Sequence, residues 1–282
     1  MFERKRPLIS IILPCWFTKE QHGKYGKHET FWFATKCLER LIAVTPKDSY
    51  EIIMIDNGST LSDEDIEHEV QQLMLGAPPV VFPAYSPSDY WAKADILIRN
   101  QQNLGFAPAC NQGFAIARGE YICCLNDDIL VWENWETALI EALALEVEPA
   151  PGIVMPALMR ETRVATEAIE TKEIDLKTNA NKFGPGAEFG SLWFCKKELL
   201  DELVVKDGYV FDENFKLGMG EDRDLWDRVR VLGYETYRTH NTRVFHQGNM
   251  TIGKVSDRKE YTTKNREYLE TKRKARGQRE EI

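Results

Sequence analysis

The sequence predicts an α/β fold with a doubly wound, mainly parallel (mixed) sheet flanked by helices. Two observations support this fold class. Short apolar runs of strand length alternate along the chain with stretches that have helical spacing. In addition, 282 residues, of which 43% are hydrophobic and 29% charged, are enough for one large domain with a buried core. Because ligands of such sheets bind at the C-terminal ends of the strands, we expect the functional residues there.

The first half of the chain is expected to contain four strands separated by helices. The strands correspond to the runs LISIIL at 8–13, EIIMID at 51–56, ADILIRN at 94–100 and EYICCLN at 120–126. Helical spacing occurs at 29–44, 62–75 and 107–118. Ser62 is the expected N-cap of the second helix, while Pro108 and Gly119 mark the start and the end of the third.

The second half of the chain alternates less regularly. Strands are expected at 152–159 and 189–195, and helices at 133–147, 196–203 and 220–234. Two stretches rich in turn formers, 17–30 and 76–91, are long for connections in an α/β domain. Loops of this length at strand ends form either lids and substrate walls or surface decoration.

Hydropathy and cysteine usage indicate a cytoplasmic protein. No apolar run approaches the ~20 residues that span a bilayer. The basic N-terminus MFERKRPLIS is not followed by the apolar stretch of a signal peptide, because Pro14 and polar residues interrupt it. The six cysteines form no CxxC pair and are expected to be buried thiols, with Cys123 and Cys124 on opposite faces of one strand.

The net charge is unevenly distributed. The segment 254–282 has ten Lys and Arg against six Asp and Glu, a balance of +4, and the whole chain has a net charge of −9, so residues 1–253 carry −13. An acidic body argues against a nucleic-acid-binding surface and indicates that a polyanionic ligand needs a metal ion. The basic segment is expected to be a solvated helix or tail, with peripheral contact at the inner membrane face as the alternative.

Three polar residues, Asn126, Asp127 and Asp128, follow the apolar strand at 120–126. Such residues are typical of a helix N-cap, and a helix is expected to follow. Their position at a strand end also suits a divalent cation, since hard cations prefer carboxylate oxygens and a bound diphosphate would lie there. Both interpretations are open for the tripeptide by itself.

IDNGST at 55–60 and GEDRDLW at 220–226 are two further acidic motifs. Asp56 ends a strand, where it is either part of a turn or a hydrogen-bond acceptor for a base or ribose. The acids of the second motif open a helix; the helix dipole explains one of them, and the surplus suggests chemistry. His246 follows a short predicted strand, and a lone histidine is more often structural than a ligand.

The order of these motifs resembles that of the family 2 glycosyltransferases of the GT-A fold, especially the rhamnosyltransferase-like branch. The matching segments are SIILPCW, IDNGST, NLGFAPACNQGFAIARGEYICCLNDD, FDENFKLGMGEDRDLWDRVRVLGY and VFHQG, so the resemblance runs from Ile9 to about Gly248. It implies a single GT-A domain at 1–253, with a nucleotide-sugar and metal-binding half at 1–130 and an acceptor-binding half at 131–253.

The resemblance also implies a function. The protein would be a metal-dependent, inverting glycosyltransferase that moves a hexosyl or deoxyhexosyl group from a UDP- or dTDP-linked donor to an acceptor hydroxyl. The acceptor would be a glycan, a lipid-linked molecule or a small molecule. Mn²⁺ or Mg²⁺ would be bound by Asp128 and His246, since Asn126 occupies the first position of the DXD-type motif. The residues expected to bind the donor are Pro14, Asp56, Asn103, Gly105, Asn111, Asn126 and Asp127.

Helix geometry separates the acceptor-side acids. Successive positions point ~100° apart, and the buried side is marked by Leu225, Trp226, Val229 and Leu232. Asp222 lies at the mouth of that side, whereas Asp224 and Asp227 are expected to point toward solvent. In the matching family motif the second acid is the base. Asp222 is therefore the expected general base, and Glu221, its rival, is expected to orient the acceptor or cap the helix.

Other classes of protein fit the sequence less well. A Rossmann dehydrogenase needs G-x-G-x-x-G after the first strand, where this chain has LPCWFT. A sugar-nucleotide pyrophosphorylase-like enzyme shares the alternating pattern but normally has a glycine-rich loop at the same place. A non-catalytic protein of the same fold that binds nucleotide sugars or glycans is the main alternative, since a sequence carries no information about rates.

Overall fold

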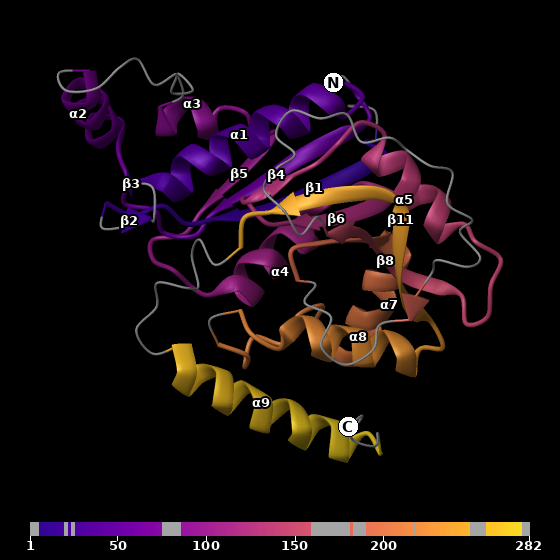
Figure 1. Cartoon of the computed structure of the whole chain (residues 1–282). Helices are drawn as coiled ribbons and strands as arrows, with labels where there is room; N and C mark the ends of the chain where they lie inside the picture. The colour runs from indigo at the N-terminus through magenta and orange to yellow at the C-terminus, as the bar shows by residue number, and fades with distance from the viewer. Residues whose placement is uncertain are drawn as a thin grey trace, which may run out of the picture.

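A mixed sheet forms the centre of the protein (Figure 1). The computed structural model describes residues 6–19, 22–23, 26–74, 86–158, 181–182, 190–216, 218–248 and 258–277. Within these residues the sheet has nine strands, in the order β5-β4-β1-β6-β10-β8-β11-β7 with β9 paired to β11. The strands are β1 (Ile9–Cys15), β4 (Tyr50–Asp56), β5 (Ile96–Arg99), β6 (Tyr121–Leu125), β7 (Ile129–Leu130), β8 (Pro151–Leu158), β9 (Asn181–Lys182), β10 (Leu192–Lys196) and β11 (Glu235–His246).

The strand directions confirm the predicted fold class. β5, β4, β1 and β6 pair in parallel, whereas β10 is antiparallel to both β6 and β8. β11 is parallel to β8 and antiparallel to β7 and β9. The four strands expected in the first half of the chain are all present, close to their predicted positions. The predicted long connection at 17–30 contains a separate two-stranded pair, β2 (His22–Gly23) and β3 (Gly26–Lys27).

Helices lie on both faces of the sheet. They are α1 (Glu29–Val44), α2 (Asp63–Met74), α3 (Pro87–Trp91), α4 (Phe106–Ile116), α5 (Trp135–Leu143), α7 (Lys197–Asp207), α8 (Glu221–Val231) and α9 (Arg258–Ala275). The predicted N-cap of α2 is confirmed, because Ser62 Oγ accepts from Asp65 N at 3.3 Å and Ser62 N donates to Asp65 Oδ2 at 2.9 Å. Much of the predicted connection at 76–91 lies outside the described residues, which resume ahead of α3.

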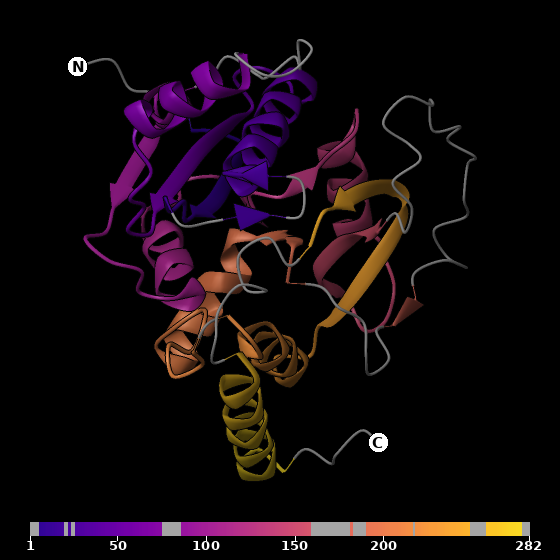
Figure 2. The same ribbon diagram turned by 60° about the vertical axis from the view of Figure 1, so that its left-hand side comes forward.

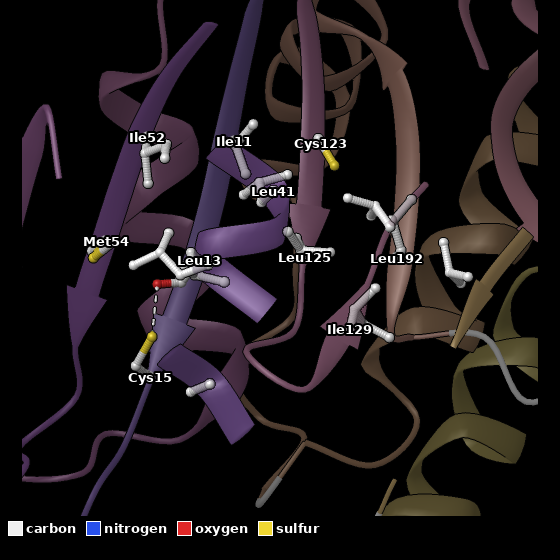
Figure 3. Packing of buried hydrophobic residues seen from close by; sticks show 14 of the residues in the cluster. Ile11, Leu13, Cys15, Leu41, Ile52, Met54, Cys123, Leu125, Ile129 and Leu192 are labelled. Atoms are coloured by element: carbon white, nitrogen blue, oxygen red, sulfur yellow. Dashed lines mark hydrogen bonds between the residues drawn. The ribbon is translucent and has the colours of Figure 1, made fainter. Parts of the chain in front are cut away.

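Two apolar clusters, one on each face of the sheet, form the core. On one face, alternate residues of β1 such as Ile11 and Leu13 pack beside Leu41 of α1 (Figure 3), and the same cluster includes residues of α3 and α5. On the other face, residues such as Ile12 pack with α4, α7 and α8. Cys123 belongs to the first cluster and Cys124 to the second, which confirms that these neighbours point to opposite faces. All six cysteines are buried and free, as expected.

The strand that carries His246 differs from the prediction. A short strand was expected, but β11 is twelve residues long, and its register against β8 shifts between Thr239 and Arg243. Figure 2 shows the resulting bend. Beyond the shift the strand pairs with β7, where His246 lies opposite Ile129. A bend of this kind lets one strand pair with two different partners.

The expectation that Asp224 and Asp227 point toward solvent is wrong. Their exposed fractions are 0% and 4%, because α9 packs along α8 (Figure 1) and covers them with basic side chains. Arg276 Nη2 lies 2.7 Å and Lys272 Nζ 3.0 Å from Asp224 Oδ1. Arg273 Nε donates to Asp227 Oδ2 at 2.6 Å. Several basic residues of the segment 254–282 therefore neutralise buried acids of the same chain.

The C-terminal segment is a helix over the residues that the structure describes there, from Arg258 to Ala275. None of the described helices combines the length and the apolarity that crossing a membrane requires. The division into two halves at residue 130, and the contact of this segment with a membrane, stay predictions.

Replacement of Asp224 by Asn is expected to lower the free energy of unfolding by about 3 kcal/mol. The change removes the buried carboxylate that lies 3.0 Å from Arg228 Nε and also pairs with Lys272 and Arg276, so that Arg228, which is 3% exposed, keeps only its 3.3 Å pair with Asp207 among the described residues. The control is Asp201→Asn, which breaks a surface pair with Lys197 and should cost less than about 1 kcal/mol. Urea denaturation measures both values, and equal effects would contradict the buried network.

Candidate active site

The ends of three parallel strands bring polar groups to one edge of the sheet. Cys15 of β1 lies opposite Asp56 of β4, which in turn lies opposite Arg99 of β5. Asp56 is 4% exposed. Its Oδ1 accepts from Ser59 N at 2.9 Å, and its Oδ2 accepts from Arg99 Nη1 at 2.9 Å. Asp56 therefore takes part in a turn and also presents a bound guanidinium at the strand ends.

Arg99 was not among the predicted site residues. Its side chain is 57% exposed, and its guanidinium lies 5.6 Å from the centre of the Trp91 ring. The missing signal was the strand register, since the residue that ends β5 is aligned with the residue that ends β4. A local motif does not show this alignment.

Asn57 joins two of the predicted donor-binding residues. Its Nδ2 donates to Asn103 Oδ1 at 2.9 Å and to the Gly105 carbonyl at 3.1 Å. Its Oδ1 accepts from Leu104 N at 3.1 Å and from Asn100 Nδ2 at 3.0 Å. The structure thus places Asn103 and Gly105 beside the end of β4, next to Asp56. Pro14 is also near these strand ends, opposite Ile55 in the register of β1 and β4.

Asn111 lies in α4 and contacts a different part of the chain. Its Nδ2 donates to the Phe211 carbonyl at 2.8 Å and to Glu213 Oε1 at 2.9 Å, while its Oδ1 accepts from Phe211 N at 2.9 Å. These bonds hold the segment that leads toward α8. A direct contact of Asn111 with the donor stays a prediction.

The structure brings Asp128 and His246 together, although 117 residues separate them in the chain. Asp128 Oδ1 is 3.2 Å from His246 Nε2. Gly248 N donates to Asp128 Oδ2 at 3.1 Å, and Gln247 N donates to the Asp128 carbonyl at 3.2 Å. The pairing of β7 with β11 causes this contact, because the two strands begin and end directly beside these residues.

Two buried oxygens near this contact lack hydrogen-bond partners among the described residues: Asn126 Oδ1 and Asp128 Oδ1. Burial, together with the neighbouring Asp128, raises the pKa of Asp127 well above its usual range. A carboxylate and an imidazole are suitable ligands for Mn²⁺, and carboxylate oxygen also suits Mg²⁺. The described part of the chain contains no group of three or more His, Cys, Asp or Glu that would enclose a metal ion. The Asp128 carboxylate and the His246 imidazole are the neighbouring side chains that could hold a cation.

The acidic pair Glu221 and Asp222 begins α8. Glu221 is 4% exposed, and its Oε2 is buried without a hydrogen-bond partner among the described residues. Burial and the nearby Asp222 raise the pKa of Glu221 to about 8. Burial also raises the pKa of Asp222, which is more exposed and accepts from Arg223 N at 2.8 Å. Burial and the charge of Asp222 thus favour the protonated form of Glu221 at neutral pH.

Gly190 and Ser191 connect the two acidic regions. The Ser191 carbonyl accepts from Asn126 N at 2.8 Å. A Cβ atom at Gly190 would lie 3.2 Å from Asp222 Oδ2, so the backbone at Gly190 is in close contact with this carboxylate. The residues just before β10 thus touch both the strand end that carries Asp128 and the start of α8. The sequence prediction missed this connection.

The mixed α/β sheet, with acidic residues at the strand ends and a second acidic pair at the start of α8, agrees with the class of GT-A glycosyltransferase folds. Residues 33–201, which are more than half of the chain, match the family Glycosyl transferase family 2. The chain belongs to this family.

Individual proteins agree with this assignment. Glycosyltransferase GlyG of Streptococcus pneumoniae is 26% identical over 225 residues, which cover 73% of this chain and 62% of GlyG. A mannosyltransferase from Pyrobaculum calidifontis, solved in complex with GDP-Man and Mn²⁺, has a TM-score of 0.52 at 17% identity. The match covers 86% of this chain and 57% of the mannosyltransferase chain. GalNAc-T7, solved with UDP, GalNAc and Mn²⁺, has a TM-score of 0.56 at 15% identity. The match covers 94% of this chain and 48% of the GalNAc-T7 chain. These structures show the GT-A fold.

The chain is shorter than the proteins that it matches. It spans from 25% to 62% of the length of the curated relatives. The rhamnosyltransferase-like branch is not distinguished by these matches.

Glu221 is expected to make the protein less stable as the pH rises from about 5 to about 8. Its pKa in the folded state, about 8, is above the ordinary 4.5, so the unfolded chain loses the proton first and stability falls across this range. The loss amounts to about 3 kcal/mol and should be absent in Glu221→Gln. Glu198→Gln, at an exposed position of the first turn of α7, is the control and should follow the wild type. Parallel urea-denaturation profiles for wild type and Glu221→Gln would refute this expectation.

Proposed function

We propose that this protein is a metal-dependent, inverting glycosyltransferase that transfers a hexosyl or deoxyhexosyl group from a nucleotide-diphosphate sugar to an acceptor hydroxyl. The observation that carries this proposal is the meeting of Asp128 and His246 at 3.2 Å beside the strand ends, with the Gly190–Ser191 backbone leading from there to Asp222. Membership of the glycosyltransferase family and the GT-A fold support it.

The donor would bind across the strand ends. Asp56 and its partner Arg99 offer an acceptor and donors of hydrogen bonds for a base or ribose. Pro14, Asn103 and Gly105 lie near the same strand ends. We propose a uridine or thymidine diphosphate as the nucleotide part, in line with the motif at 55–60.

Asp128 and His246 would hold Mn²⁺ or Mg²⁺, with Asn126 and Asp127 beside them. The fit rests on the buried Asp128 Oδ1, which has no hydrogen-bond partner among the described residues, and on the imidazole 3.2 Å from it. A bound cation would stabilise the charge of the leaving nucleoside diphosphate.

Asp222 is proposed as the general base. It takes the proton of the acceptor hydroxyl while the hydroxyl oxygen forms a bond to the anomeric carbon, and the bond from that carbon to the diphosphate breaks with its electron pair on the diphosphate. Glu221 is protonated at neutral pH, since its pKa is about 8, and its Oε2 is unpaired among the described residues. A neutral acid of this kind would donate a hydrogen bond and orient the acceptor.

The acceptor is proposed to be a glycan, a lipid-linked molecule or a small molecule that is met in the cytoplasm. Peripheral contact with the inner membrane face would bring a lipid-linked acceptor within reach. This contact would use basic residues of the segment 254–282 other than those that pair with Asp212, Asp224 and Asp227.

Calorimetry with UDP, dTDP, GDP and CMP, each with Mn²⁺, is expected to show the tightest binding for UDP or dTDP. Asp128→Ala and His246→Ala should each weaken this binding about 10-fold or more, because each removes a ligand of the cation. When Mn²⁺ is removed by a chelator, the two variants and the wild type should bind the nucleoside diphosphate equally weakly. A preference for GDP would contradict the nucleotide assignment. Unchanged Mn²⁺-dependent binding in both variants would contradict the metal site.

Asp222→Asn is expected to reduce transfer by about 10² to 10⁴-fold while donor and metal binding stay unchanged. The amide nearly matches the carboxylate in shape but does not accept the proton. The measurement is release of nucleoside diphosphate from a nucleotide sugar in the presence of Mn²⁺. Glu221→Gln keeps a neutral hydrogen-bonding group and should retain far more activity. If Asp222→Asn turns over like the wild type and Glu221→Gln is inactive, the base is Glu221.

A further inference from the structure

The helix α9 lies outside the segment 33–201 that matches the family, yet it contacts the backbone just before the acidic pair. Asn265, in the middle of α9, is 5% exposed. Its Nδ2 donates to the carbonyls of Lys216 and Met219, both at 2.7 Å, and its Oδ1 accepts from Lys216 N at 3.2 Å. One amide side chain thus holds three backbone groups ahead of Glu221.

The backbone that Asn265 contacts would be mobile without such a partner. Gly218 and Gly220 flank Met219 and have φ values of 74° and 105°, a region that glycine adopts more readily than other residues. The Gly220 carbonyl accepts from Asp224 N at 3.0 Å and so begins the hydrogen bonding of α8. A shift of this backbone would therefore move the first turn of α8, which carries Glu221 and Asp222.

The helix α9 is itself fixed on the protein by charged and aromatic contacts. Tyr268 OH donates to Asp212 Oδ2 at 3.0 Å, and its ring lies 5.1 Å from that of Phe215. Lys272 pairs with Asp212 and Asp224, and Arg276 pairs with Asp224. Because these acids are almost fully buried, the pairs are shielded from solvent and hold α9 in place. Asn265 therefore acts from a rigid element.

We propose that Asn265 is a positioning residue for the transfer reaction: by hydrogen bonding to Lys216 and Met219 it fixes the backbone that presents Asp222 to the acceptor. This inference rests on the proposed function, in which Asp222 is the base. Misplacement of a catalytic group by about 1 Å reduces the rate by roughly 100-fold, so a clamp on this backbone has a direct effect on turnover.

The test compares Asn265→Ala, Asn265→Asp and Lys264→Ala. Asn265→Asp keeps the shape of the side chain but removes both donated hydrogen bonds, and Lys264 pairs with Glu260 on the exposed side of the same helix. Hydrogen–deuterium exchange measures the backbone at 219–222. Nucleoside diphosphate release from UDP-glucose, dTDP-rhamnose and GDP-mannose with Mn²⁺ measures turnover. Both Asn265 variants are expected to exchange faster at 219–222 and to lose about 10- to 100-fold in kcat, with the donor KM unchanged. Lys264→Ala should match the wild type.

The outcomes separate this proposal from the proposed function. Wild-type exchange at 219–222 in Asn265→Asp would overturn the clamp. Faster exchange with an unchanged kcat would overturn its role in the reaction. If the wild type releases nucleotide from none of the donors and does not bind the nucleoside diphosphates, the proposed function fails, and with it the role of Asn265 in transfer, whereas the exchange result still shows whether Asn265 holds this backbone.

Discussion

The cost of removing carboxylates from water governs the arrangement of this protein, and it is met in two different ways. Asp212, Asp224 and Asp227 are buried beside basic side chains from α8 and α9, which neutralise them. In the part of the chain that the structure describes, no Lys or Arg pairs with Asp127, Asp128 or Glu221. Burial instead raises the pKa of Asp127 and of Glu221. Of these six carboxylates, the three with protein cations fix α8 and α9, and the three without them lie in the candidate active site, where Asp56 is a further acid that is paired with Arg99.

The carboxylates without cationic partners are positioned by their backbone, and at the start of α8 this backbone depends on the first group. A carboxylate without a cationic partner is not held by electrostatic attraction, so its position must come from the backbone that carries it. Asp128 is fixed by the antiparallel pairing of β7 with β11 and by the Gly248 amide. Asp222 is fixed by the start of α8, which the ion pairs with α9 hold in place. The charged network on α8 therefore stabilises the fold and at the same time orders the site.

The positions of the strands could be predicted from short apolar patterns in the sequence, and the pairing of Asp128 with His246 from the resemblance to a family. Apolar runs mark strands, and strand ends mark the edge of the sheet. The burial of Asp224 and Asp227 could not be predicted from the pattern of α8 alone, since their partners Lys272, Arg273 and Arg276 are about fifty residues away. For the same reason the pairing of Asp56 with Arg99, and the connection through Gly190 and Ser191, appear only when strand register and loop positions are known.

Two buried oxygens of the described residues that form no hydrogen bond, Asn126 Oδ1 and Glu221 Oε2, belong to the two acidic regions of the site, where Asp128 Oδ1 has only His246 Nε2 at 3.2 Å. A buried polar atom without a hydrogen bond costs about 1–3 kcal/mol, so each of them makes the protein alone less stable than a chain in which the atom is paired. A molecule that supplies a cation or a hydroxyl to these atoms removes that cost when it binds. The free energy lost in folding at these positions is therefore recovered as affinity, and binding at either region should stabilise the fold.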